Sequence, residues 1–174
     1  MKKTNFCILL FLVIFFSIQL TIPQNYTFNA DEPTHALLGL FYKDLILNIG
    51  KFHSFDDIKI FAVNYIIKYP KISAYFPPLY HLLIASFFLI GESLFLIRIL
   101  NIFLAILTSF IIYKLSFELV SQKNIALLSA IFFLSFSLVF YYTDKIMVDI
   151  LQILTFSSVL LFYLKFNQNS NVLP

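Results

Sequence analysis

Residues 94–120 read LFLIRILNIFLAILTSFIIYKLSFELV and contain only three charged side chains. A helix rises about 1.5 Å per residue and the hydrocarbon core of a bilayer is about 30 Å thick, so this run is long enough to cross it. Similar apolar runs occupy residues 6–22, 125–142 and 146–164, each near or above the roughly 18 residues that indicate a span. The sequence therefore predicts an all-α integral membrane protein with about four transmembrane helices, organised as a single membrane module over residues 1–174.

The composition also favours a membrane protein. Hydrophobic residues make up 60% of the chain, charged residues make up 12%, and the mean hydropathy is +0.89. Soluble domains carry about 25% charged residues, and so much apolar surface cannot be buried in one small globule. The net charge of +3 is too small and too scattered to indicate a nucleic-acid partner. A single cysteine, Cys7, excludes an internal disulfide and a cysteine metal cluster.

The first apolar run is predicted to be a retained span with a cytoplasmic N-terminus. Lys2 and Lys3 precede it, and its exit from Gln19 to Pro23 lacks a small-residue cleavage site. With four spans, five lysines and one glutamate fall inside, whereas seven basic and eight acidic residues fall outside. This lysine excess is what the positive-inside rule requires. We therefore expect a multi-pass protein of the plasma membrane or the endoplasmic reticulum.

Residues 23–93 form the predicted outer loop, which we expect to carry two helices along the membrane surface. After Pro33, apolar residues recur at three- and four-residue steps, as on an amphipathic helix. The stretch Phe52 to Lys71 mixes aromatic and charged residues, which predicts irregular or briefly helical structure. The run Leu79 to Ile90 reaches only about 18 Å as a helix, well short of the bilayer core. The apolar residues predicted for the first helix are Leu37, Leu38, Phe41, Leu45 and Ile49.

An alternative topology treats residues 79–90 as a fifth, short span. It would place Asp144 and Asp149 in the cytoplasm, because every later loop would change sides. The charge distribution favours the surface helix.

An adjacent acid pair, Asp31 and Glu32, stands just beyond the first membrane exit, with His35 one helical turn later. Carboxylates at the lipid boundary can serve as a general base or hold a cation. The alternative is an ordinary helix start, with Asp31 or Glu32 as the N-cap and Pro33 in the first turn. The two interpretations are compatible, because a carboxylate held at a helix start is both oriented and kept ionised.

Ionisable residues also stand at the edges of the later spans. Asp149 opens the last one, after Asp144 and Lys145, and such groups usually face a polar cavity. Asp149 is therefore a second functional candidate, and the alternative is an interfacial helix cap paired with Lys145. Glu92 and Arg98 flank the start of the second span; they can pair with each other, while Arg98 can bind a phosphate or snorkel to lipid headgroups.

No metal or nucleotide motif is evident. His35, His53 and His81 lack the close ligand spacing of a zinc site, so no metal-ligating residue is predicted. The three glycines form no phosphate-cradling loop. The chemistry therefore has to come from the acids, the histidines and Arg98.

The order of these features resembles the C-type glycosyltransferases. These are membrane enzymes that use polyprenyl-phosphate sugars, and they include protein O-mannosyltransferases and aminoarabinose transferases. The resemblance runs colinearly from Phe6 to Leu164 and implies that the chain is the N-terminal portion of a longer enzyme. It rests on the first span, the acid pair, the amphipathic helix, Pro77-Pro78-Leu79-Tyr80 before the short helix, Gly91-Glu92-Ser93-x-x-x-x-Arg98, and Asp149.

The resemblance implies an inverting transfer of a sugar in a single displacement. Asp31 would be the catalytic base that takes the proton of an acceptor hydroxyl, with Glu32 as its neighbour. Asp149 would help to organise the acceptor and the lipid phosphate. No cofactor is required, although the scheme leaves room for a divalent cation between the acids. The substrate-binding residues predicted beside these catalytic ones are His35, Tyr80, His81, Arg98 and Asp144.

The implied partners are a polyprenyl-phosphate-linked sugar donor, a protein or glycan acceptor, and membrane lipid. Enzymes of this type run to several hundred residues, so the chain is interpreted as a piece of a longer enzyme, a degenerate remnant, or a short chain that assembles with a second chain supplying further spans. One position departs from the pattern: relatives such as the aminoarabinose transferases have a lysine before the Pro-Pro pair, facing the donor phosphate, and Phe76 stands there in this chain. Lys71, Arg98 or His81 would have to substitute.

Two other functions compete with a transferase. The first is a non-catalytic membrane subunit or scaffold, in which the acids are helix caps and the aromatic outer loop binds a partner. The second is a transporter fragment. It is disfavoured because no predicted span carries a charged residue at mid-depth or a Gly/Pro break.

Overall fold

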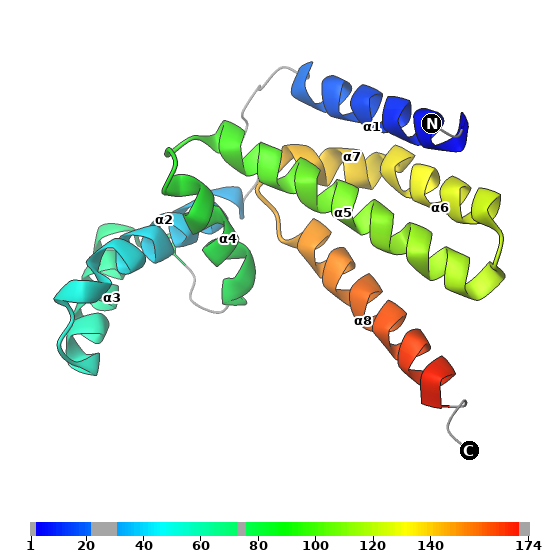
Figure 1. The fold of residues 1–174 in the computed structure, drawn as a ribbon. Coiled ribbons are helices and arrows are strands. Elements are labelled where there is room, and N and C mark those ends of the chain that lie inside the picture. Colours follow the sequence, from blue (N-terminus) through cyan, green and yellow to red (C-terminus); the bar gives the residue numbers. More distant parts are fainter. Residues whose placement is uncertain (1–2, 22–30, 73–75, 171–174) are drawn as a thin grey trace. The chain divides into compact units, whose positions relative to one another are not determined.

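The computed structural model describes residues 3–21, 31–72 and 76–170, and this part of the chain is helical and contains no strand (Figure 1). The chain divides into two compact units. One consists of residues 1–25 and 101–174, and the other of residues 26–100. The predicted all-α fold is confirmed.

The unit of residues 26–100 is built around two helices that pack along each other, α2 and α4. The helix α2 begins where the sequence predicts, because Asp31 occupies the N-cap position and Pro33 lies in the first turn. The backbone N–H of His35 donates to the carbonyl of Asp31 (3.1 Å), which closes that turn. The helices of this unit are α2 (Glu32–Asn48), the 3-10 turn η1 (Ile49–Lys51), α3 (Phe55–Lys68), α4 (Pro78–Phe88) and the start of α5 (Leu94–Val120).

A glycine sets how closely α2 approaches α4. A Cβ atom placed on Gly39 would overlap the side chain of Ile84 and stand 3.3 Å from the ring of Phe88. Ile84 is completely buried. Only glycine fits at this point. The side chain of Ile84 in α4 therefore packs almost directly against the backbone of α2.

The helix α3 differs from the irregular or briefly helical structure expected for residues 52–71. It runs for 14 residues and begins with a capping box. The hydroxyl of Ser54 accepts from the N–H of Asp57 (3.2 Å), and the Asp57 carboxylate accepts from the N–H groups of Ser54 (2.9 Å) and His53 (2.8 Å). These backbone donors lower the pKa of Asp57. The outer loop therefore carries three helices, and the signal missed was Ser54-x-x-Asp57, with aspartate in the place usually held by glutamate.

The helix α4 is short, as predicted. It starts at Pro78, directly after the Pro-Pro pair, and its 11 residues rise only about 16 Å. That length is too small to cross a bilayer core of about 30 Å. Its position along the membrane surface stays a prediction.

The other unit contains the helices long enough for the membrane. Within the described residues, Leu94–Val120 and Asp149–Gln168 are long and apolar enough to cross, and the bent pair α6 and α7 would be a third span. The first predicted span is a helix over Lys3–Thr21, and its crossing stays a prediction. The helices of this unit are α1 (Lys3–Thr21), most of α5, α6 (Lys123–Ser135), α7 (Ser137–Asp144) and α8 (Asp149–Ser170).

The span predicted over residues 125–142 is broken. Figure 1 shows α6 and α7 as separate helices, bent by 54° at Phe136, whose backbone is extended (φ −70°, ψ 130°). Neither Gly nor Pro is involved. The hydroxyl of Ser135 donates to the carbonyl of Ile131 (2.9 Å) in the last turn of α6 before the break. The expectation that no predicted span carries a Gly/Pro break therefore holds here, although the helix is not continuous.

Candidate active site

The face of α2 that packs against α4 is polar. Its buried residues include Glu32, His35, Gly39 and Lys43. Of the apolar stripe predicted for this helix, only Leu38 is buried, and Ile49 is 68% exposed. The periodicity thus predicts the helix correctly, and the apolar stripe is mostly left uncovered by the protein.

His35 and His81 meet in this interface and join α2 to α4. The Nδ1 atom of His35 lies 2.9 Å from the Nε2 atom of His81. The Nδ1 atom of His81 lies 3.1 Å from the carbonyl oxygen of Pro77. Both rings are buried, with exposed fractions of 2% for His35 and 0% for His81. Both ring nitrogens of His81 are therefore engaged within the protein.

Aromatic rings enclose this pair. Phe76 lies 4.6 Å from the His35 ring, Tyr80 lies edge-on at 6.0 Å, and Tyr42 is stacked 6.4 Å from His81. Burial, together with the neighbouring His35, lowers the pKa of His81 to about 4, although the Pro77 carbonyl acts in the opposite direction. His81 is therefore neutral at physiological pH. Phe76, where relatives have a lysine, packs against the imidazoles.

A second polar cluster lies further along the same face of α2. The Nζ atom of Lys43 forms an ion pair with Glu92 and lies 3.3 Å from Asp44 Oδ1, and the hydroxyl of Tyr65 donates to Asp44 Oδ2 (3.1 Å). The bond to Glu92 raises the pKa of Lys43, and burial raises the pKa of Tyr65. Glu92, proposed from the sequence as a partner of Arg98, is thus tied to α2. The signal missed for Lys43 is that His35, Gly39 and Lys43 follow one another at four-residue steps.

The acid pair stands at the start of α2. Asp31 is exposed and its side chain makes no capping hydrogen bond, whereas Glu32 is buried. The hydroxyl of Thr34 donates to the carbonyl of Lys71 (3.1 Å) and so fixes the first turn to the segment after α3. The Asp31 carboxylate is therefore exposed, at a helix start whose backbone is held in place.

Asp144 and Asp149 belong to the other unit, at the two ends of the turn between α7 and α8. Asp149 is the first residue of α8, as predicted, and is half-buried. The side chain of Asn101, which is completely buried in α5, donates from Nδ2 to the carbonyl of Lys145 (2.5 Å). The ammonium group of Lys145 lies 5.9 Å from the ring of Tyr141. Asn101 was missed from the sequence, although a polar amide inside an apolar span is itself a signal.

The structure thus brings some of the predicted site residues together. His35, Tyr80 and His81 form one cluster, and Asp31 and Glu32 lie one turn from it. Arg98 is buried in the first two turns of α5. A cavity shared by Asp31 and Asp149 stays a prediction.

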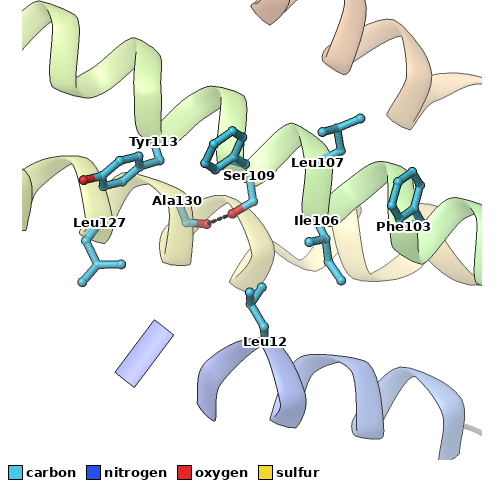
Figure 2. Close-up of a pocket in the computed structure, with 9 residues that line it drawn as sticks. Leu12, Phe103, Ile106, Leu107, Ser109, Tyr113, Leu127 and Ala130 are labelled. Carbon is cyan, nitrogen blue, oxygen red and sulfur yellow. Dashed lines mark hydrogen bonds between the residues drawn. The ribbon is translucent and has the colours of Figure 1, made fainter. Parts of the chain in front are cut away.

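An apolar groove lies in the unit of residues 1–25 and 101–174. It has a volume of about 470 Å³, and Figure 2 shows it between α1, α5 and α6. Its polar groups are the hydroxyl of Tyr113 and that of Ser109, which donates to the carbonyl of Ala130 (3.3 Å). Such walls suit hydrocarbon rather than a sugar. Its remaining lining residues are Leu12, Phe103, Ile106, Leu107, Phe110 and Leu127.

Metal ligands do not gather in the part of the chain that the structure describes. In residues 3–21, 31–72 and 76–170, no group of three or more His, Cys, Asp or Glu side chains is close enough to hold an ion. A cation held by only two acids falls outside this observation, so the divalent cation between the acids stays a prediction.

Comparison with known proteins gives one functional assignment. Residues 75–173 match the family model described as dolichyl-phosphate-mannose-protein mannosyltransferase, which covers more than half of the chain. No curated protein and no solved structure matches this chain. Asp31, Glu32 and His35 lie before the matched range. The predicted site residues inside that range are Tyr80, His81, Arg98, Asp144 and Asp149.

Proposed function

Since the chain belongs to the dolichyl-phosphate-mannose-protein mannosyltransferase family, we propose that it transfers a sugar from a polyprenyl-phosphate donor to an acceptor hydroxyl at the outer face of a membrane. The family match carries the transferase class, and the long apolar helices provide the membrane location. The family description supports mannose as the sugar and a protein hydroxyl as the acceptor in this proposal. The reaction is an inverting, single displacement.

Asp31 is the base in this proposal. The acceptor oxygen attacks the anomeric carbon, the bond from that carbon to the phosphate oxygen breaks, and the polyprenyl phosphate leaves with the electron pair. The acceptor proton passes to the carboxylate of Asp31. This role is supported by the exposure of Asp31 and by its place at the N-terminus of α2. Glu32 is its buried neighbour.

The donor phosphate is assigned to Arg98. Arg98 is a buried guanidinium inside the range matched by the family, and guanidinium groups bind phosphate with two parallel hydrogen bonds. His81 is less suited, because both of its ring nitrogens are engaged within the protein. Asp149 and Asp144 organise the acceptor and the lipid phosphate from the turn that Asn101 supports. Positioning and charge stabilisation supply most of the rate.

The proposed topology is multi-pass with the N-terminus in the cytoplasm. Single cysteines at Ser54 and Ser121, each in a Cys7→Ser background, test it with a membrane-impermeant thiol reagent on intact cells. Cysteine at position 54 should react and cysteine at position 121 should not. Labelling at position 121 alone would reverse the orientation.

Transfer itself is tested with the chain reconstituted in vesicles. Dolichyl phosphate mannose carrying a radiolabel is supplied with a serine- and threonine-containing peptide. We expect labelled peptide in which the sugar has the opposite anomeric configuration to the donor, with no loss of rate when a chelator is added. A retained configuration would contradict the single displacement. Inactivation by the chelator, reversed by a divalent cation, would establish the cation between the acids that the scheme permits but does not require.

A non-catalytic subunit or scaffold is the competing function. It is favoured by the outer helix α3, which exposes Phe55 (79%), Ile60, Val63 and Ile67 (72%) as a surface for a partner. This alternative predicts that replacing Asp31 leaves glycosyl transfer by the complete assembly unchanged. It also predicts loss of a co-purifying protein when Ile60 and Ile67 are replaced by serine.

A further inference from the structure

The hydrogen bonds of the His35–His81 pair fix where its protons lie. A carbonyl oxygen only accepts, so the Nδ1 atom of His81 carries a proton and donates to Pro77. In a neutral ring the other nitrogen, Nε2, is then an acceptor. The Nδ1 atom of His35 must therefore donate to it across the 2.9 Å contact. The neutral pair has one arrangement, in which both rings carry their proton on Nδ1.

This arrangement requires His81 to be neutral. If His81 gained a proton on Nε2, two N–H groups would face each other unless His35 gave up its own Nδ1 proton. The surroundings also disfavour a charge, because both rings are buried. The titratable groups that face the pair are Tyr42 from α2 and Tyr80 from α4, and Glu32 lies three residues before His35.

The pair is connected to the acid motif through one turn of helix. The side chain of His35 is tied to α4, while its backbone N–H holds the carbonyl of Asp31. Thr34 ties the same turn to the carbonyl of Lys71. The start of α2 is therefore held from two sides, and His35 is the residue that links both Asp31 and α4.

We propose that His35 and His81 are positioning residues that hold the acid motif of α2 against α4 through a neutral, directional imidazole pair. The pair touches no reacting atom. The pair keeps the Asp31 carboxylate at a fixed point of the site. It does so only while Nδ1 of His35 donates to Nε2 of His81 and Nδ1 of His81 donates to the carbonyl of Pro77. This inference rests on the proposed transferase function for its catalytic consequence, but its structural part stands without it.

The structural part is tested by NMR of the reconstituted chain labelled with ¹⁵N-histidine. The chain has three histidines, and the exposed His53, assigned with a His53→Asn variant, is the reference. We expect a protonated Nδ1 on both His35 and His81, and an unprotonated Nε2 on His81, from about pH 8 to about pH 6. A protonated Nε2 on His81 in this range would overturn the proposal.

The functional part is tested with matched substitutions. His35→Asn keeps an N–H donor near the Nδ1 position, whereas His35→Leu removes it. We expect His35→Leu to lower kcat about tenfold or more with little change in the donor KM, and His35→Asn to recover part of the loss. His35→Leu combined with His81→Leu should be no worse than either single change, because the two rings act as one unit. His53→Asn should match the wild type.

Two outcomes separate the failure of this inference from that of the proposed function. If His35→Leu and His81→Leu raise the donor KM and leave kcat unchanged, the histidines bind substrate and the positioning role is wrong. If wild-type chain transfers no sugar while the NMR shows the expected proton order, the pair stands as a structural lock and the transferase proposal fails. Circular dichroism of each variant confirms that it is folded.

Discussion

At the scale of single residues, several buried polar side chains of this apolar chain are tied to backbone carbonyls outside regular helix. His81 bonds to Pro77, Thr34 to Lys71, and Asn101 to Lys145. A buried carbonyl outside the regular helices needs such a donor, because leaving a buried acceptor unsatisfied costs about 1 to 3 kcal/mol. The polar residues therefore hold the irregular segments that connect the helices.

The pKa of His81 gives a prediction about pH. Its pKa is about 4 in the folded chain against 6.5 ordinarily, so the unfolded chain binds more protons between these values and stability falls as the pH decreases through this window. His81→Gln removes the titrating group. We expect wild type to exceed His81→Gln in unfolding temperature at neutral pH, with the gap narrowing from about pH 6.5 toward about pH 4. A gap independent of pH in detergent-solubilised protein would contradict the neutral pair.

Asn101 gives a second prediction at this scale. Asn101→Ala leaves the carbonyl of Lys145 without this donor, which costs about 1 to 3 kcal/mol for a buried group. We expect faster hydrogen exchange in residues 145–149 and a lower transfer rate. Ser129→Ala is the control, since that hydroxyl only back-bonds to Ile125 within α6. Equal exchange in both variants would show that Asn101 does not hold the turn.

At the scale of elements, what could be predicted from the sequence depended on whether the signal was local. The start of α2 at Asp31-Glu32-Pro33 and the start of α4 after Pro77 were predicted because capping and proline geometry act within a few residues. The pairing of His35 with His81 was not, since it joins residues 46 apart and depends on helix packing. The break at Phe136 was missed because it contains neither Gly nor Pro.

The close approach of α2 and α4 gives a prediction about stability. Gly39→Ala places a methyl group against Ile84, so the helices must separate, at a cost of about 1 to 3 kcal/mol. Gly50→Ala is a matched control, because nothing lies within 4 Å of a Cβ there. Thermal unfolding of both variants should show a lower Tm for Gly39→Ala alone. Equal Tm values would mean that the two helices are not packed as closely as described.

At the scale of the whole molecule, the membrane class could be predicted from composition and run lengths alone. The family match supports the transferase class over residues 75–173, a range that contains parts of both compact units. The assignment of Asp31 to the site does not rest on the family match. Asp31 stands before the matched range, so its catalytic role rests on the resemblance of the acid motif and on its exposed position at the start of α2.

The second chain expected from the sequence is a prediction at this scale as well. An antibody against residues 52–71 detects the protein in native membranes, and the apparent mass is read before and after denaturation. If a partner chain is present, the apparent mass before denaturation should exceed the apparent mass after it. Identical masses near 20.3 kDa, allowing for bound detergent, would leave the chain acting alone.

The most direct test of the central claim compares Asp31→Asn with Asp56→Asn in the vesicle transfer assay. The first change removes the proposed base and keeps its shape. The second removes an exposed carboxylate from the first turn of α3, outside the site. General-base catalysis contributes about 10² to 10⁴ in rate, so we predict a loss of that size for Asp31→Asn and none for Asp56→Asn. Equal transfer rates for the two variants would contradict the assignment of Asp31 as the catalytic base.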